Sequence, residues 1–197
     1  LVYQLQPTMN LRAAYGRTLA RPTFRELAPY ASFDFVGDYI LIGNRDLDRT
    51  LVDNLDLRWE WFRQPGELYA ASVFLKEFDR PIERAILTDN GEIQFQNVDE
   101  ARVLGLELEG RQGLALLGPA FRHLFAGANL SLIHSEVSIP AKELAVRRTL
   151  DPLAPAKRSL QGQSPYLLNL DLSYDNPGTG LAGGLYFNLF GDRLSEV

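Results

Sequence analysis

Apolar and polar residues alternate along most of the chain with a period of two. The clearest example is the segment 54–61. Its apolar positions are Leu55, Leu57, Trp59 and Trp61, and its polar positions are Asn54, Asp56, Arg58 and Glu60. An extended strand places these two sets on opposite faces, whereas a helix would scatter both sets around its circumference. The segment is therefore predicted to be a β-strand with one apolar and one polar face.

The same alternation recurs elsewhere in the chain. It is clear in residues 10–18, 101–111, 121–134 and 165–174, and weaker in residues 68–77 and 181–191. Residues 1–5 resemble the end of one more strand. The pattern predicts an all-β fold with seven full antiparallel strands and a partial one at the N-terminus.

The connections between these segments alternate between short and long. The short ones are residues 63–67, 112–120 and 175–180, and the long ones are roughly residues 20–50, 79–99 and 135–162. An up-and-down transmembrane β-barrel of the outer-membrane type has short turns at one end and longer loops at the other. Strands of about ten residues also match the length of a tilted membrane-spanning strand. We therefore expect the chain to form part of such a barrel.

Aromatic residues gather at the strand ends next to the short turns. The predicted aromatic girdle consists of Trp59, Trp61, Phe62, Tyr69, Phe121 and Tyr174. Alternation alone cannot distinguish a face packed in a soluble core from a face exposed to lipid. Aromatic side chains at one level of the strands favour the membrane, because they are enriched at membrane–water interfaces.

Alternation then assigns the faces. The residues expected to face lipid are Leu55, Leu57, Trp59, Leu106, Leu130 and Leu170. The residues expected to face the lumen are Arg12, Asn54, Asp56, Arg58, Glu60, Lys76, Glu107, Glu109, Arg111, Asn129, Asn169 and Asp171. Arg17 and Glu77 fall on the apolar face near the long-loop ends of their strands, where a charge costs only ~0–1 kcal/mol.

Composition narrows the classes of function. The formal net charge is −5, which disfavours a general nucleic-acid binder with its basic surface. The chain has no cysteine, so disulfides, thiolate catalysis and cysteine-ligated zinc are excluded. No apolar run approaches the roughly 20 residues of a membrane-spanning helix.

Two charged sets on the polar face invite a functional interpretation. Glu107 and Glu109 would lie about 7 Å apart on one strand face, a spacing compatible with general acid–base chemistry. Arg12, Arg58, Lys76 and Arg111 would form a basic track for an anionic ligand. We favour ordinary lumen chemistry for both sets, with the cations paired to acidic residues on neighbouring strands. Catalytic motifs are also missing from the sequence, so an enzyme is not expected.

Metal ligands are sparse. Asp46, Asp48 and Asp53 form an acidic segment, but the central Gly and terminal Glu of an EF-hand are missing, which leaves only an irregular calcium site open. His123 and His134 are the only histidines, and His134 with Glu136 supplies too few ligands for a closed site. No metal or other cofactor is expected.

Several fragments resemble one known family. The first is Arg21-Pro22-Thr23-Phe24-Arg25-Glu26-Leu27-Ala28-Pro29. It is followed by Gly43-Asn44-x-x-Leu47, Asn54-x-Asp56-Leu57-Arg58-x-Glu60, Pro65-Gly66-Glu67, Pro81-Ile82-Glu83, Asn97, Gly105-x-Glu107-x-Glu109, Gly127-Ala128-Asn129 and Gly162-Gln163-Ser164-Pro165-Tyr166-x-x-Asn169. Their order and spacing resemble the barrel of TonB-dependent outer-membrane receptors. Arg45 and Asp48-Arg49 depart from the family pattern.

The resemblance implies a function, and it implies partners. Residues 1–197 would be a C-terminal fragment of one β-barrel domain, with the plug domain and the final strands outside this chain. The receptor would import a scarce nutrient of siderophore, cobalamin or glycan type with energy supplied through TonB. Its partners would be outer-membrane lipid and lipopolysaccharide, its own plug domain, the TonB complex and a small-molecule ligand, with no nucleic acid.

Other classes of protein remain open. One alternative is a passive porin or structural outer-membrane barrel, and another is a soluble all-β carbohydrate-binding or adhesion domain. The ligand is not identified by the sequence, because ligand contacts come from loops. In the first long segment, Tyr30, Phe33, Phe35 and Tyr39 could stack on a ligand, but we favour packing of that loop against its neighbours.

Overall fold

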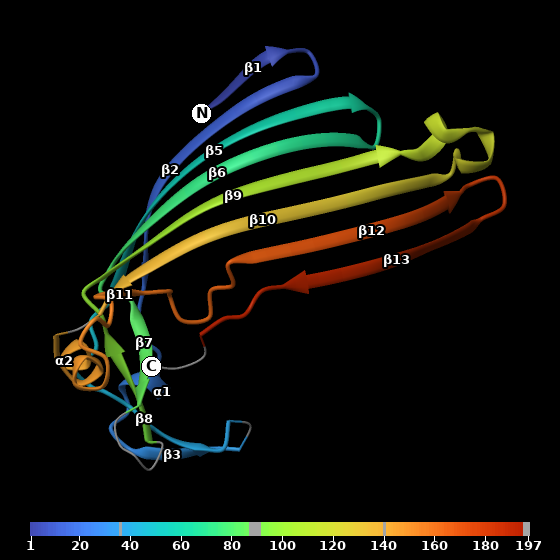
Figure 1. The fold of residues 1–197 in the computed structure, drawn as a ribbon. Coiled ribbons are helices and arrows are strands. Elements are labelled where there is room, and N and C mark those ends of the chain that lie inside the picture. The colour runs from blue at the N-terminus through green and yellow to red at the C-terminus, as the bar shows by residue number, and fades with distance from the viewer. Residues whose placement is uncertain (36, 87–91, 140, 195–197) are drawn as a thin grey trace.

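One large antiparallel sheet forms most of the molecule (Figure 1). The computed structural model describes residues 1–35, 37–86, 92–139 and 141–194. The main strands are β1 (Val2–Gln6), β2 (Met9–Ala20), β5 (Thr50–Gln64), β6 (Glu67–Asp79), β9 (Glu100–Gly113), β10 (Leu124–Ser138), β12 (Tyr166–Asn176) and β13 (Leu181–Phe190). They lie side by side in chain order, and the short β11 (Lys157–Arg158) pairs with β10. The predicted up-and-down barrel fold is confirmed, with a sheet that is open rather than closed.

The short connections follow local turn chemistry. Between β5 and β6, Gly66 adopts a φ of 84°, a left-handed conformation that glycine reaches at little cost. The link between β9 and β10 instead contains two 3-10 turns, η1 (Leu114–Leu117) and η2 (Pro119–Phe121). Residues 121–134 were predicted as one strand, which is wrong at its start. Pro119 begins a helical turn that includes Phe121, so the strand starts at Leu124.

The long connections contain secondary structure that alternation did not predict. They form α1 (Phe24–Leu27), β3 (Ala31–Asp34), β4 (Tyr39–Ile42), β7 (Ile82–Ile86), β8 (Glu92–Asn97) and α2 (Ala141–Leu150). The four strands make a second sheet in the order β3-β4-β8-β7, in which β4 and β8 are parallel. Residues 87–91, between β7 and β8, lie outside the described part of the chain. The second sheet lies at one end of the large sheet (Figure 1).

The two helices are short, and the start of α1 has a local cause. Thr23 and Glu26 form a capping box at the start of α1, in which each side chain accepts a hydrogen bond from the other's backbone N–H. In the described residues, no helix has the length and apolar character needed to cross a membrane.

The densest apolar packing lies where the long connections meet the large sheet. Val98, Ala101 and Val137 are buried together, and Phe78 and Leu160 pack against them. Phe78, Ala101 and Val137 are direct cross-strand partners and therefore share one face of the sheet. The long connections thus fold back over one face at one end of the strands, while the strand centres remain uncovered.

Candidate functional site

The strand register gathers the polar side chains on a single face, called the polar face below. One cross-strand row runs from Arg12 through Arg58 and Ser72 to Glu107. The adjacent row contains Asn10, Glu60, Ala70, Glu109, Asn129 and Asn169. By the same register, all twelve residues assigned to the lumen from sequence share this face. It is also the face that carries Phe78, Ala101 and Val137, over which the long connections fold.

Arg58 lies at the centre of an ion-pair network on the polar face. Its guanidinium donates to Glu60 at 2.9 Å and to Glu109 at 2.6 Å. Arg12 donates to the second oxygen of Glu60 at 2.7 Å, and Arg58 also donates to the Ser72 hydroxyl at 3.1 Å. The expected pairing with an acidic residue on a neighbouring strand is therefore confirmed for Arg12, whereas Arg58 pairs with Glu60 of its own strand and with Glu109 two strands away.

Other residues of the polar face pack against aromatic rings or fill space left by glycine. The Arg111 guanidinium lies 5.4 Å from the centre of the Phe125 ring, and the Lys76 ammonium lies 5.8 Å from that of Phe74. A Cβ at Gly127 would lie 1.9 Å from a carboxylate oxygen of Asp171. The absence of a side chain at this position leaves room for Asp171.

The opposite face, called the apolar face below, exposes a continuous apolar surface. One row contains Leu57, Val73, Leu106 and Leu132. Leu57, Val73 and Leu132 are each between 46% and 48% exposed. Proteins surrounded by water rarely expose a contiguous apolar surface of this kind. An apolar phase in contact with this face would account for it.

The predicted girdle residues divide between the two faces. Trp59, Trp61, Tyr69 and Tyr174 lie on the apolar face by register, and the rings of Trp61 and Tyr69 are 5.7 Å apart. Phe62 follows Trp61 along β5 and lines a hollow with Glu109 and Arg111 of the polar face. Phe121 lies in η2. Contact of any of the six with a membrane interface stays a prediction.

Charged side chains cross the apolar face at its long-loop end. This outer charge row consists of Arg17, Asp53, Glu77, Arg102 and Glu136, which are direct cross-strand neighbours. Its ion pairs are Arg17–Asp53 at 3.8 Å and Arg102–Glu77 at 2.6 Å. Lys157 of β11 extends it by pairing with Glu136 at 2.9 Å. From sequence, only Arg17 and Glu77 had been noticed as exceptions to alternation.

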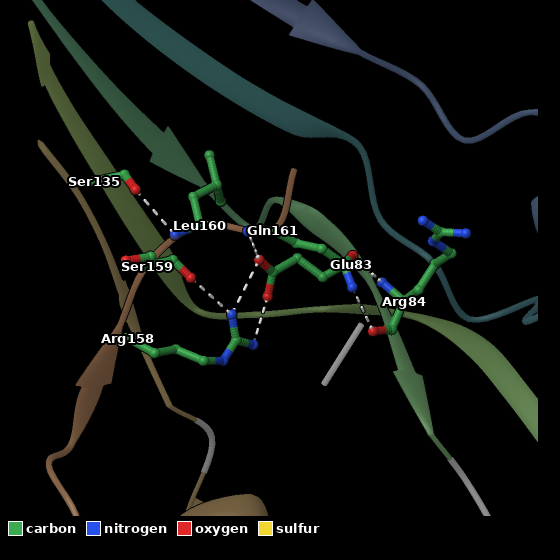
Figure 2. Close-up of polar contacts among 7 residues, drawn as sticks. All are labelled: Glu83, Arg84, Ser135, Arg158, Ser159, Leu160 and Gln161. Atoms are coloured by element: carbon green, nitrogen blue, oxygen red, sulfur yellow. Dashed lines mark hydrogen bonds and ion pairs between the residues drawn. The ribbon is translucent and has the colours of Figure 1, made fainter. Parts of the chain in front are cut away.

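A buried polar cluster joins the long connections at the polar face (Figure 2). Arg158 of β11 donates two hydrogen bonds to the carboxylate of Glu83 in β7, at 2.6 and 3.2 Å. Only 7% of the Arg158 side chain and 3% of the Glu83 side chain are exposed. Sequence analysis assigned neither residue to a site, because each lies in a segment without alternation and 75 positions separate them.

The other candidate residues are not brought together. Asp48 pairs with Arg80 at 2.7 Å, and Asp53 lies in the outer charge row. In the part of the chain that the structure describes, no group of three His, Cys, Asp or Glu side chains could hold a metal ion. His123 packs against Tyr174 with a ring separation of 5.9 Å, and His134 lies 3.5 Å from Glu136.

The aromatic residues of the first long connection contact mostly other residues of that connection. Phe33 and Phe35 meet edge to face, with ring centres 5.0 Å apart. Tyr39 accepts a hydrogen bond from Arg84 of β7 at 2.8 Å. Tyr30 lines a shallow hollow beside α1 with Phe24 and Leu27. The favoured packing of this loop against its neighbours is therefore seen for Tyr39, whereas Tyr30, Phe33 and Phe35 are exposed.

The sequence and the fold were compared with those of known proteins. Residues 1–196 match the family model described as TonB dependent receptor-like, beta-barrel. The siderophore receptor PirA from Pseudomonas aeruginosa has a similar structure, with 19% identity and a TM-score of 0.61, over 96% of this chain and 29% of PirA. A variant of the ferric enterobactin receptor PfeA from the same organism, in complex with enterobactin, is also similar. It has 20% identity and a TM-score of 0.61, over 96% of this chain and 27% of PfeA. No curated protein matches the sequence. The chain thus spans less than a third of the length of these receptors, and the likeness shows a shared fold.

Proposed function

Because this chain belongs to the TonB-dependent receptor β-barrel family, we propose that it is part of a receptor that imports a scarce nutrient with TonB-supplied energy. Proteins of this family lie in the outer membrane of Gram-negative bacteria and are transport receptors rather than enzymes. The observation that carries the proposal is that the large sheet, which matches the family model, has one apolar face and one polar face. The apolar face fits lipid, and the polar face fits an aqueous lumen.

The height of the apolar face supports a membrane-spanning position. In β5, Trp61 at the short-turn end lies eight positions after Asp53 in the outer charge row. At roughly 3.3 Å per residue this is about 26 Å along the strand. A tilt of about 40° reduces the height to about 20 Å, close to the ~25 Å apolar band of outer-membrane barrels. The outer charge row would then lie at the level of the lipid headgroups or lipopolysaccharide.

The proposal includes partners outside this chain. The paired charges around Arg58 would face the receptor's own plug domain, since a plug fills the lumen in this family. The TonB complex would act through a segment of the receptor upstream of this chain. The long connections, which cover one end of the polar face, would form the extracellular mouth.

A ferric siderophore is our proposed class of ligand. PirA is named as a siderophore receptor, and PfeA is a ferric enterobactin receptor. Exposed aromatic rings in the first long connection, such as Phe35, offer contact area for an aromatic ligand. Cobalamin and glycans are the other ligand types that this family accepts, and uptake measurements would separate them.

The test is an uptake assay with the full-length receptor in a host that lacks its own siderophore receptors. We expect accumulation of iron-55 from ferric enterobactin or another ferric siderophore when TonB is present, and none when TonB is deleted. Radiolabelled cobalamin and maltodextrin would be measured in parallel. Accumulation of cobalamin or maltodextrin instead would contradict the proposed ligand class but would still support an import receptor.

Uptake that continues without TonB and follows the external concentration would contradict the proposal. Such a result would indicate a passive pore, which was the alternative left open by the sequence. The empty host and a host expressing the receptor without its plug provide the two reference levels for this measurement.

A further inference from the structure

Two of the three long connections are joined through their own sheet. Strand β4, from the first connection, runs parallel to β8 from the second, with Leu41 opposite Ile93. Both of these residues are almost fully buried. The Asn97 side chain accepts from the backbone N–H of Asp48 at 2.8 Å and donates to the backbone oxygen of Asp48 at 3.1 Å. The first and second connections therefore share a continuous set of backbone and side-chain contacts.

The third connection joins this sheet through polar side chains, called the latch below and drawn in Figure 2. Besides the two bonds from Arg158, the Glu83 carboxylate accepts from the backbone N–H of Gln161 at 3.0 Å. The Gln161 side chain in turn accepts from the Arg84 N–H at 2.8 Å and donates to the Arg84 oxygen at 3.1 Å. Glu83, Arg158 and Gln161 thus connect β7 to β11 and to the segment that follows it.

The latch is also anchored to the wall of the large sheet. Arg158 pairs with Val137 of β10, and the Leu160 N–H donates to the Ser135 hydroxyl at 3.1 Å. A buried ion pair is costly to desolvate unless its geometry is good and further hydrogen bonds satisfy it. The bidentate contact and the Gln161 N–H give both Glu83 oxygens a partner, and Arg158 Nη1 also donates to the Ser159 carbonyl at 3.3 Å. Such pairs are retained in some proteins because they fix one arrangement of the chain rather than because they add stability.

We propose that the latch makes the three long connections one rigid cover over the end of the polar face. The connection between β10 and β12 then cannot move away from the other two while Glu83 and Arg158 remain paired. Opening of this end of the sheet is a movement of the whole cover. The proposal concerns contacts within this chain, and its test needs no ligand and no transport.

The experiment measures distances between spin labels on the full-length receptor in lipid nanodiscs. Labels at Arg45→Cys and Leu153→Cys report on the first and third connections, and both positions are exposed. Labels at Arg45→Cys and Ile86→Cys report on the first and second connections. This chain contributes no cysteine of its own to the labelling. Each pair of labels is measured in the receptor with the unaltered latch and in the variants Glu83→Gln and Arg158→Gln.

With the latch intact, we expect one narrow distance peak for each label pair. Glu83→Gln and Arg158→Gln should remove the narrow Arg45–Leu153 peak and leave the Arg45–Ile86 peak unchanged, because the contacts between β4 and β8 do not involve the latch. In parallel, we expect amide exchange at Leu160 and Gln161 to become at least ~tenfold faster in the single variants, because removing one partner of a buried ion pair costs more than this factor.

Two further variants keep the outcome decisive. Glu83→Gln/Arg158→Met removes both charges and leaves neither one buried without its partner, so we expect it to fold even if a single variant fails. It should also lose the Arg45–Leu153 peak. Glu77→Gln breaks the exposed pair with Arg102 and should change neither peak. A narrow Arg45–Leu153 peak in the folded double variant would overturn the proposal. Loss of the Arg45–Ile86 peak as well would also overturn it, since the latch would then support the whole cover rather than join the third connection to it.

Discussion

Two ion pairs at the same end of the large sheet have the same closest separation and opposite surroundings. Glu77–Arg102 on the apolar face and Glu83–Arg158 beneath the loop cover both close to 2.6 Å. The side chains of the first pair are 50% and 64% exposed, and those of the second are 3% and 7% exposed. Distance alone would rank them equal. Burial separates them, because a charge left without its partner costs little in water and much in the interior.

The largest effect is expected from breaking the buried pair. Glu83→Gln leaves the Arg158 guanidinium buried without a carboxylate, which costs about 3–5 kcal/mol. The measurement is the free energy of unfolding of the full-length receptor in lipid, obtained by urea titration. A loss of unfolding free energy below about 1 kcal/mol would be typical of an exposed ion pair. It would contradict the difference drawn between Glu83–Arg158 and Glu77–Arg102.

The second effect compares the two faces of one strand. Leu57 lies midway between Asp53 and Trp61 on the apolar face, so Leu57→Arg should cost about 2–4 kcal/mol in a membrane. Its neighbour Asp56 lies on the polar face, and Asp56→Arg should cost much less. The same titration in liposomes measures both variants. Equal losses would contradict the assignment of the faces.

The network on the polar face should give an intermediate effect. Arg58→Met removes the hydrogen bonds to Glu60 and Glu109, and hydrogen bonds to charged groups contribute about 1.5–3 kcal/mol. Arg12 still pairs with Glu60 in this variant, so the loss should fall towards the lower end of that range. Arg12→Met, whose side chain is more exposed, serves as the matched comparison and should lose less.

The smallest effect is expected at the exposed pair. Glu77→Gln should change the free energy of unfolding by about 0.2–1 kcal/mol, and the change should shrink as salt is added. Titrations at low and high ionic strength would measure it. A loss as large as that of Glu83→Gln would show that lipid, rather than water, surrounds the outer charge row.

The strands were predictable from the sequence and the loop cover was not, for a physical reason. Leu55, Leu57 and Trp59 alternate with polar residues because each strand has one apolar and one polar face, and this signal is local. The pairing of β4 with β8 joins short segments about 50 positions apart, so neither carries a signal of its own. Phe121 was misassigned because alternation continued through residues that Pro119 turns into a 3-10 helix.

The candidate site divides in the same way. The shared face of the twelve polar residues followed from alternation, and the structure adds which of them pair. Glu83 was noticed only as part of a family-like fragment, and Arg158 was not noticed at all. Their contact depends on how two long connections fold over the sheet, and the alternation of apolar and polar residues carries no information about that folding.

The most direct test of the central claim is a cysteine scan along β5 in the full-length receptor, in cells. Each position from 54 to 61 would be replaced singly by cysteine and labelled with a water-soluble thiol reagent; this chain has no other cysteine. We predict labelling at even positions such as Asp56 and Arg58, and protection at odd positions such as Leu57 and Trp59, where lipid excludes the reagent. Labelling at the odd positions, or equal labelling throughout, would contradict a sheet with one face in lipid and the other in an aqueous lumen.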